Sequence, residues 1–217
     1  MPVAVTIDQL SELAPACLPE YRSAFSCGET VLARYAISDS ALRVAHFIAQ
    51  VLHETGALTL QYENLRYSRK RLVEIWPRRF KPRGALDPAA YAYQPEKLAN
   101  AVYGGRMGNV APGDGYLYRG RGLLQLTGKD GYERATTLLQ QAWQNAPDLV
   151  RAPDQAVSAQ WCLHVAAAQW HARGCNRAAD SDDVAAVTFL INGGAIGLAE
   201  RIRWTAKTRA VWVQGNA

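Results

Sequence analysis

Residues 41–67, with the sequence ALRVAHFIAQVLHETGALTLQYENLRY, contain the features that decide how the chain folds. The first part has apolar residues at helical spacing, which predicts a helix buried along one side. We expect this helix to end at Glu54, because Gly56 can adopt the positive φ that terminates many helices. Apolar and polar residues then alternate from 58 to 63, which predicts a short strand with Glu63 on its polar side.

The two carboxyl groups of this stretch are expected to lie near each other in different surroundings. At helical spacing Glu54 adjoins Phe47, Gln50 and Val51, an apolar wall that favours the neutral acid. Glu63 has polar neighbours and is expected to stay ionised. Such a pair can serve as a general acid and a general base, most often in the cleavage of glycosidic bonds. The alternative is that both are ordinary solvated residues at a helix end and in a loop.

Length and composition indicate one soluble globular domain. The chain of 217 residues is long enough to bury a core. No apolar run reaches the roughly 20 residues of a membrane span, so stable membrane insertion is not expected. Neither a repeat nor a linker is visible. We therefore expect residues 1–217 to form a single domain of two lobes without a separate wall-binding module. The amino terminus, MPVAVTIDQLSEL, lacks the pattern of a secretory signal, which predicts synthesis in the cytoplasm.

The charge of the chain indicates which kind of partner it can bind. The net charge of +5 favours anionic partners such as nucleic acid, membrane surfaces or an acidic cell-wall polymer, and the basic residues concentrate in segment 66–83.

The four cysteines Cys17, Cys27, Cys162 and Cys175 lack the two-residue gap of a zinc knuckle or redox motif. Two disulfides are possible, but free thiols are the expectation for a cytoplasmic product.

Several common catalytic motifs are missing. His53-Glu54 begins an HExxH zinc motif, but Ala57 stands where the second histidine should be, so no metal site is expected. The segment GRGLLQLTG lacks the lysine of a phosphate-binding loop. No Gly-x-Ser-x-Gly elbow for a nucleophilic serine is present.

The rest of the chain alternates predicted helices with one glycine-rich loop. In residues 103–122, YGGRMGNVAPGDGYLYRGRG, tyrosines alternate with glycines and arginines, which favours an ordered loop whose aromatic rings, such as that of Tyr118, hold sugars. One further helix is expected to start at the Thr6/Gln9 capping box. Others are expected over residues 68–76, from Pro95 onward, over 132–143, over 155–173 and from Ser181 onward, and a last helix contains residues 200–211.

Five motifs in a fixed order resemble one enzyme family. They are HETG followed by YENLRYS, then VYGGRMGN, GDGYLYRGRGLLQLTG and INGGAIGLAER. Together they resemble glycoside hydrolase family 19, the chitinase-like group, and within it the endolysins of bacteriophages and prophages. The resemblance covers about residues 45–203. It implies a mainly helical, α+β lysozyme-like fold, in which two helical lobes and a small β-element flank a substrate cleft.

The resemblance also implies roles for individual residues. Glu54 matches the general acid and Glu63 the general base of an inverting hydrolysis of β-1,4 bonds between amino sugars, with carboxyl groups roughly 6.5–9.5 Å apart. Three further residues match positions that bind the substrate or hold the attacking water: Gln125, Thr127 and Asn192. Arg201 matches an arginine that pairs with the acidic cluster, and near Glu63 it would keep the base ionised. No cofactor is implied.

Departures from the family pattern favour peptidoglycan over chitin as the expected substrate. Gly131-Tyr132 replaces the Asn-Tyr of many members, and the short gap between Glu54 and Glu63 is that of the phage-like branch. The expected protein is a monomeric muramidase that reaches the wall through a membrane pore or a secretion apparatus and does not bind nucleic acid. The alternatives are a chitinase, or a non-catalytic protein that binds glycan or nucleic acid through segment 66–83.

Overall fold

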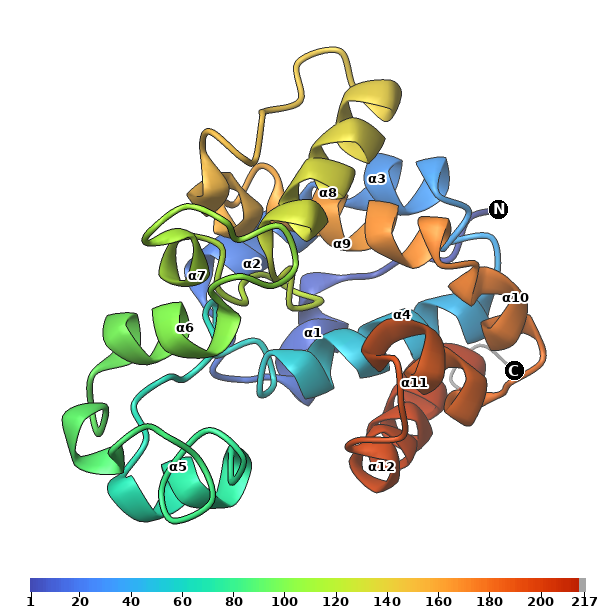
Figure 1. The fold of residues 1–217 in the computed structure, drawn as a ribbon. Coiled ribbons are helices and arrows are strands. Elements are labelled where there is room, and N and C mark those ends of the chain that lie inside the picture. The colour runs from blue at the N-terminus through green and yellow to red at the C-terminus, as the bar shows by residue number, and fades with distance from the viewer. Residues whose placement is uncertain (215–217) are drawn as a thin grey trace.

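A computed structural model describes residues 1–214 of the chain as a helical protein (Figure 1). Its helices are α1 (Ile7–Leu13), α2 (Pro19–Ser26), α3 (Glu29–Arg34), α4 (Ala41–Glu54), α5 (Arg69–Ile75), α6 (Pro95–Tyr103), α7 (Asp114–Leu117), α8 (Lys129–Ala142), α9 (Cys162–Ala172), α10 (Cys175–Asp180), α11 (Val184–Asn192) and α12 (Leu198–Arg209). The short elements η1 (Pro88–Ala90) and η2 (Pro153–Val157) are 3₁₀ turns, and η3 (Ala210–Gln214) is a π turn. The expected domain includes residues 215–217, which lie outside the described residues.

Helix α4 is the central element of the fold. It begins after Ser40 and ends at Glu54, with Gly56 just beyond it at φ +55°, so the predicted helix and its end are confirmed. Residues 44–52 are all buried, which is more than the one-sided burial that its sequence pattern predicts. A helix that is enclosed on every side lies inside a core and does not cover one.

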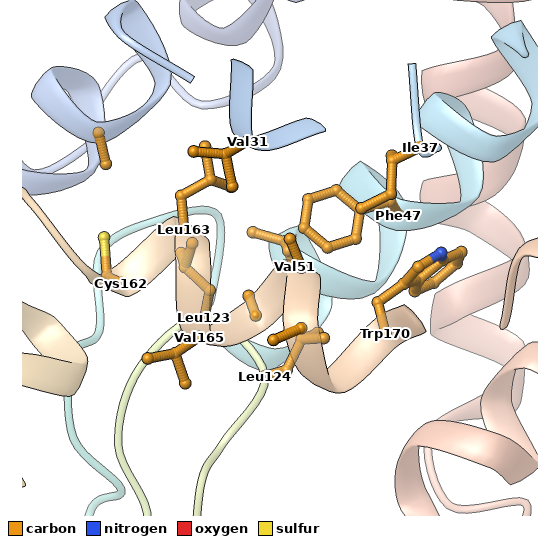
Figure 2. Packing of buried hydrophobic residues seen from close by; sticks show 14 of the residues in the cluster. Val31, Ile37, Phe47, Val51, Leu123, Leu124, Cys162, Leu163, Val165 and Trp170 are labelled. Carbon is orange, nitrogen blue, oxygen red and sulfur yellow. The ribbon is translucent and has the colours of Figure 1, made fainter. Parts of the chain in front are cut away.

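The main core packs around the middle of α4 (Figure 2). The ring of Phe47 meets the indole of Trp170 edge-on, with ring centroids 5.4 Å apart. Val51 lies in the same cluster as Leu124 and Leu163. Residues from α4, α9 and the loop before α8 therefore share one apolar interior.

A second, smaller core gives the molecule its other lobe. Its buried residues are Leu65, Leu72, Phe80, Leu98, Ala99 and Val102. These residues come from α5, α6 and the segments next to them, which lie to one side of the main helical body in Figure 1. Two separate apolar clusters agree with the expected pair of helical lobes.

The predicted strand after α4 is wrong. Ala57 and Leu58 both have positive φ, at +60° and +62°, and the Leu58 amide donates to Thr55 Oγ1 at 2.9 Å. The chain thus turns back on the helix end, which buries Leu58 completely. Within residues 1–214 the extended structure consists of isolated bridges, of which Tyr62–Arg121 and Arg121–Leu126 are antiparallel.

Two other helix predictions need correction, and the causes are local capping interactions. The expected helix 155–173 is interrupted because Ser158 Oγ donates to the Gln155 carbonyl and accepts from the Trp161 amide. Asp183, and not Ser181, caps α11, since its carboxylate accepts from the Ala186 amide. The capping box at Thr6 and the start of α5 after Ser68 are confirmed.

The four cysteines are free thiols in this structure. Burial raises the pKa of both Cys162 and Cys175 to about 12, so these two remain neutral members of the core. In the part of the chain that the structure describes, none of the helices has the length and apolar character that crossing a membrane requires.

Truncating Phe47 tests the central position of α4. Phe47→Ala removes a fully buried ring that contacts Trp170, and we expect the free energy of unfolding to fall by about 3–5 kcal/mol. Ile202→Ala, at a half-exposed position on α12, should change it by less than about 0.5 kcal/mol. Urea denaturation followed by circular dichroism measures both. Equal effects of the two substitutions would contradict the packing described here.

Candidate active site

Glu54 is the last residue of α4, and its carboxylate is held by an arginine from α12. Arg201 Nη2 donates to Glu54 Oε1, and Arg201 Nη1 donates to Gln50 Oε1. The side chain of Arg201 is only 3% exposed, whereas that of Glu54 is 15% exposed. A buried cation therefore holds one oxygen of the Glu54 carboxylate, while part of the side chain remains open to solvent.

This arrangement corrects two expectations. The predicted pairing of Arg201 with the acidic cluster is present, but its partner is Glu54, whereas the sequence interpretation placed the cation beside Glu63. The wall next to Glu54 is also not purely apolar, because Gln50 and Arg201 form part of it.

His53 packs against the turn that leads into α12. Gly197, at φ +74°, has no room for a side chain, since a Cβ there would lie 2.6 Å from His53 Nε2. Burial lowers the pKa of His53, and the Arg201 charge lowers it further, so the imidazole is neutral at pH 7. Its Nδ1 lies 3.5 Å from a carboxylate oxygen of Glu200. The neutral ring thus fills the space between Glu54 and the start of α12 without adding charge.

Glu63 is held by groups from the other lobe and from the glycine-rich loop. The Tyr103 hydroxyl donates to Glu63 Oε2 at 2.6 Å. The Gly120 amide donates to Glu63 Oε1 at 2.5 Å, and the Glu63 amide donates to the Gly120 carbonyl at 2.9 Å. Burial first and the Glu63 charge second raise the pKa of Tyr103, which keeps its hydroxyl protonated and able to donate. Two hydrogen bonds to the carboxylate and one from the Glu63 backbone therefore fix the position of this residue.

Gln125 and Thr127, the candidate water-binding residues, lie close to Glu63 around Gly120. A Cβ at Gly120 would lie 2.6 Å from Gln125 Oε1, 3.1 Å from Thr127 Oγ1 and 3.2 Å from Glu63 Oε1. The three predicted residues are thus brought together around one glycine. Their oxygen atoms are the kind of acceptors that can orient a water molecule beside a general base.

The loop that carries Gln125 and Thr127 is closed by backbone hydrogen bonds. Arg121 and Leu126 exchange both of their amide-to-carbonyl bonds, at 3.1 and 2.8 Å. Gln125 adopts φ +46°, which is unusual for a residue with a side chain, and strain of this kind often occurs at functional sites. The Thr127 hydroxyl donates to the Gln125 carbonyl at 3.2 Å.

The remaining predicted site residues have different surroundings. Asn192 ends α11 with an exposed side chain, and its amide group donates to the Ile196 carbonyl at 3.4 Å. Tyr118 is only 4% exposed, stacks on Tyr132 and donates its hydroxyl to the Val150 carbonyl. The ring and hydroxyl of Tyr118 are thus both used in the core, and its predicted contact with a sugar stays a prediction.

Sequence reasoning did not assign roles to three residues around this site. Tyr103 was grouped with the other tyrosines of the glycine-rich loop, and its hydrogen bond to Glu63 was not foreseen. The Arg119 guanidinium lies between the rings of Tyr62 and Tyr116, 4.8 and 4.1 Å from their centroids, and it braces the loop next to Gly120. Arg121 is buried at 1% exposure, close to Asp154. The alternation of tyrosine with arginine in YLYRGR was the available signal for this stacking.

The site contains the groups that acid–base hydrolysis requires. Glu54 and Glu63 are carboxyl groups with different partners, and Gln125 and Thr127 lie beside the second of them. Among residues 1–214 no group of three or more histidine, cysteine, aspartate or glutamate side chains is arranged to hold a metal ion.

Comparisons with known proteins identify a related sequence and similar folds. No family model matches the chain. A "glycosyl hydrolase family 19 domain-containing protein" of Haemophilus influenzae is 35% identical over 164 residues, which are 75% of this chain and 76% of that protein. Chitinase C from Streptomyces griseus has a similar fold, with a TM-score of 0.63 at 15% identity, and the match covers 97% of this chain and 93% of the chitinase.

A bacterial family 19 chitinase also has this fold, with a TM-score of 0.55 at 19% identity over 94% of this chain and 95% of the chitinase. At such low identity the solved structures show the fold alone. The identity and coverage of the Haemophilus protein establish the family. The chain therefore belongs to glycosyl hydrolase family 19, whose enzymes cleave β-1,4 bonds in polymers of amino sugars.

Proposed function

We propose that this glycoside hydrolase cleaves peptidoglycan at the β-1,4 bond between N-acetylmuramic acid and N-acetylglucosamine. The observation that carries the mechanism is the placement of Glu63, which Tyr103 and Gly120 hold next to Gln125 and Thr127. In this proposal the protein is an endolysin-like monomer that is made in the cytoplasm and reaches the wall through a pore or a secretion apparatus.

The proposed reaction is a single inverting displacement. Glu54 donates its proton to the leaving glycosidic oxygen, and Glu63 takes a proton from a water that attacks the anomeric carbon from the opposite face. Gln125 and Thr127 orient this water, while Asn192 binds the sugar chain. For this reaction the two carboxyl groups must stand roughly 6.5–9.5 Å apart, so that one water fits between Glu63 and the sugar.

Arg201 gives the proposed reaction an electrostatic partner at Glu54. After Glu54 has given up its proton, the adjacent guanidinium stabilises the carboxylate that remains. Proton donation to the leaving group is favoured in this way.

The surface charge supports an acidic polymer as the substrate. Arg66, Arg69 and Lys70 are exposed at and before the start of α5, and the chain carries a net charge of +5. Peptidoglycan carries carboxylates, whereas chitin is neutral. Attraction between opposite charges raises the local concentration of such a substrate. A chitinase is the second candidate, because the solved structures with this fold include chitinases.

Replacing the general acid tests the assignment of Glu54. In Glu54→Gln the amide oxygen can still accept from Arg201, but the side chain has no proton to give at neutral pH. We expect kcat on purified sacculi to fall at least about 10³-fold, and Thr127→Ala to lose less, on the order of tenfold. Turbidity loss gives the rates, and circular dichroism checks that both variants fold. A folded Glu54→Gln that retains more activity than Thr127→Ala would refute the assignment.

Removing one hydroxyl tests the hydrogen bond that positions Glu63. Tyr103→Phe deletes the donor to Glu63 Oε2 without changing the ring, and a hydrogen bond to a charged group has the energy to change the rate about tenfold or more. We expect the loss in kcat with little change in KM, because the base and not the substrate is affected. Tyr93→Phe, at an exposed ring, is the matched control. Similar kinetics for both variants would show that this hydrogen bond does not matter.

The products identify the substrate and the bond. We expect the enzyme to solubilise purified sacculi and to leave muramic acid at each new reducing end, which mass spectrometry of borohydride-reduced fragments detects. Glucosamine at the new ends would mean that the other linkage is cut. Release of oligomers from colloidal chitin, with sacculi left intact, would instead support the chitinase.

A further inference from the structure

A cavity of about 380 Å³ adjoins the candidate water-binding residues. Gln125 and Thr127 form part of its wall. Arg134 from α8, Gln169 from α9 and Arg173 just after α9 line it as well. The cavity is more than ten times the roughly 30 Å³ that one water molecule occupies in the liquid, so it has room for a substituent and not only for solvent.

The charged side chains that line the cavity are both cationic. Its lining contains Arg134 and Arg173 but no aspartate or glutamate. Neither arginine forms an ion pair with a carboxylate of residues 1–214, although Arg173 Nη1 donates to the Ile191 carbonyl at 2.8 Å. Both arginines are exposed residues. Desolvation is the main influence that lowers the pKa of Arg173, and the Arg134 charge also lowers it, whereas Cys175 and the Glu54 charge raise it. An anion between the two arginines would relieve their repulsion.

The nearest acidic side chains on α8 face a different hollow. Asp130 and Glu133 line a neighbouring depression that shares Arg134 with the cavity. They lie near one edge of Arg134, but they do not enter the lining that contains Gln169 and Arg173. The lining of the cavity therefore contains no carboxylate, although the charge of Glu54 acts on Arg173 from nearby.

Gln169 supplies an independent sign that a ligand binds. Its side chain is 7% exposed, and its Nε2 has no hydrogen-bond partner among the described residues. A buried amide donor without an acceptor is costly to maintain, and most native proteins avoid one. An acceptor atom of a bound group in the cavity would satisfy it.

We propose that this cavity is a subsite for a carboxylate attached to the amino-sugar chain. Arginine binds carboxylates through two parallel hydrogen bonds, and a side-chain amide can donate one more. Because Gln125 and Thr127 belong to the same wall, the bound carboxylate would sit on a sugar close to the bond that is cut. This inference rests on the proposed function. On peptidoglycan the carboxylate is either the free lactyl group of a muramic acid that carries no peptide or, where the lactyl group is joined to a peptide as an amide, a carboxylate of that peptide.

Ligand binding to the inactive Glu54→Gln protein tests the subsite without relying on turnover. Three probes are titrated by calorimetry: an N-acetylglucosamine–N-acetylmuramic acid disaccharide with a free lactyl carboxylate, the same disaccharide with its peptide, and neutral chitobiose. We expect at least one acidic probe to bind more tightly than chitobiose. Arg134→Gln, added to the inactive protein, should lower this preference about tenfold, since it removes one charge-assisted contact.

The same titrations include a matched control variant, and they identify the source of the carboxylate. Arg203→Gln removes the same charge from an exposed position on α12 and should change the preference less than twofold. A preference shown by the free disaccharide identifies the lactyl group, and one shown only by the peptide-bearing probe identifies a peptide carboxylate. Equal binding of all three probes, or equal effects of Arg134→Gln and Arg203→Gln, would overturn the subsite.

The two proposals fail in distinguishable ways. If the active enzyme digests sacculi and Arg134→Gln digests them as fast as Arg203→Gln does, the subsite is refuted and the proposed function stands. If the active enzyme cuts chitin but not sacculi, the proposed function is refuted, and the titrations still decide whether the cavity binds a carboxylate. Urea denaturation of Arg134→Gln ensures that any loss is not a loss of fold.

Discussion

The charge of Arg201 is the constraint on which the candidate site depends. Burying a guanidinium is costly unless a carboxylate and hydrogen-bond acceptors lie next to it. Glu54 and Gln50 provide both, and both belong to α4, so the ion pair joins α12 to the last turns of the central helix. Thr208 strengthens the same junction through a 2.8 Å hydrogen bond to the Ala45 carbonyl. The residue proposed to give up a proton thus also serves as a structural counter-ion.

Glu63 depends on a different part of the molecule. Tyr103 comes from the smaller lobe, where α6 packs on its own apolar cluster, and Gly120 comes from the glycine-rich loop. Arg119 keeps that loop in place by stacking between two tyrosine rings. Glu54 therefore belongs to the main body of the fold, and Glu63 lies in the region between the two lobes. Each carboxylate has its own set of hydrogen-bond partners.

Local signals in the sequence predicted local structure well, and they did not predict long-range partners. The end of α4 at Glu54 follows from its apolar run and from Gly56, so the prediction was right. Alternation after the helix suggested a strand, but backbone with positive φ at Leu58 turned the chain, because burying that side chain against the core was more favourable. The partner of Arg201 and the hydrogen bond from Tyr103 join residues that are far apart in the chain, and no spacing rule encodes such contacts.

The reciprocal hydrogen bonds between Glu63 and Gly120 have a mechanical consequence. They tie the carboxylate to the backbone of the loop that also carries Gln125 and Thr127, so these groups shift together as a rigid unit. Glu54 belongs to the opposing body built on α4 and α12. The separation between the two carboxyl groups is therefore set by how the glycine-rich loop is placed against α4 and α12, and not by either side chain alone.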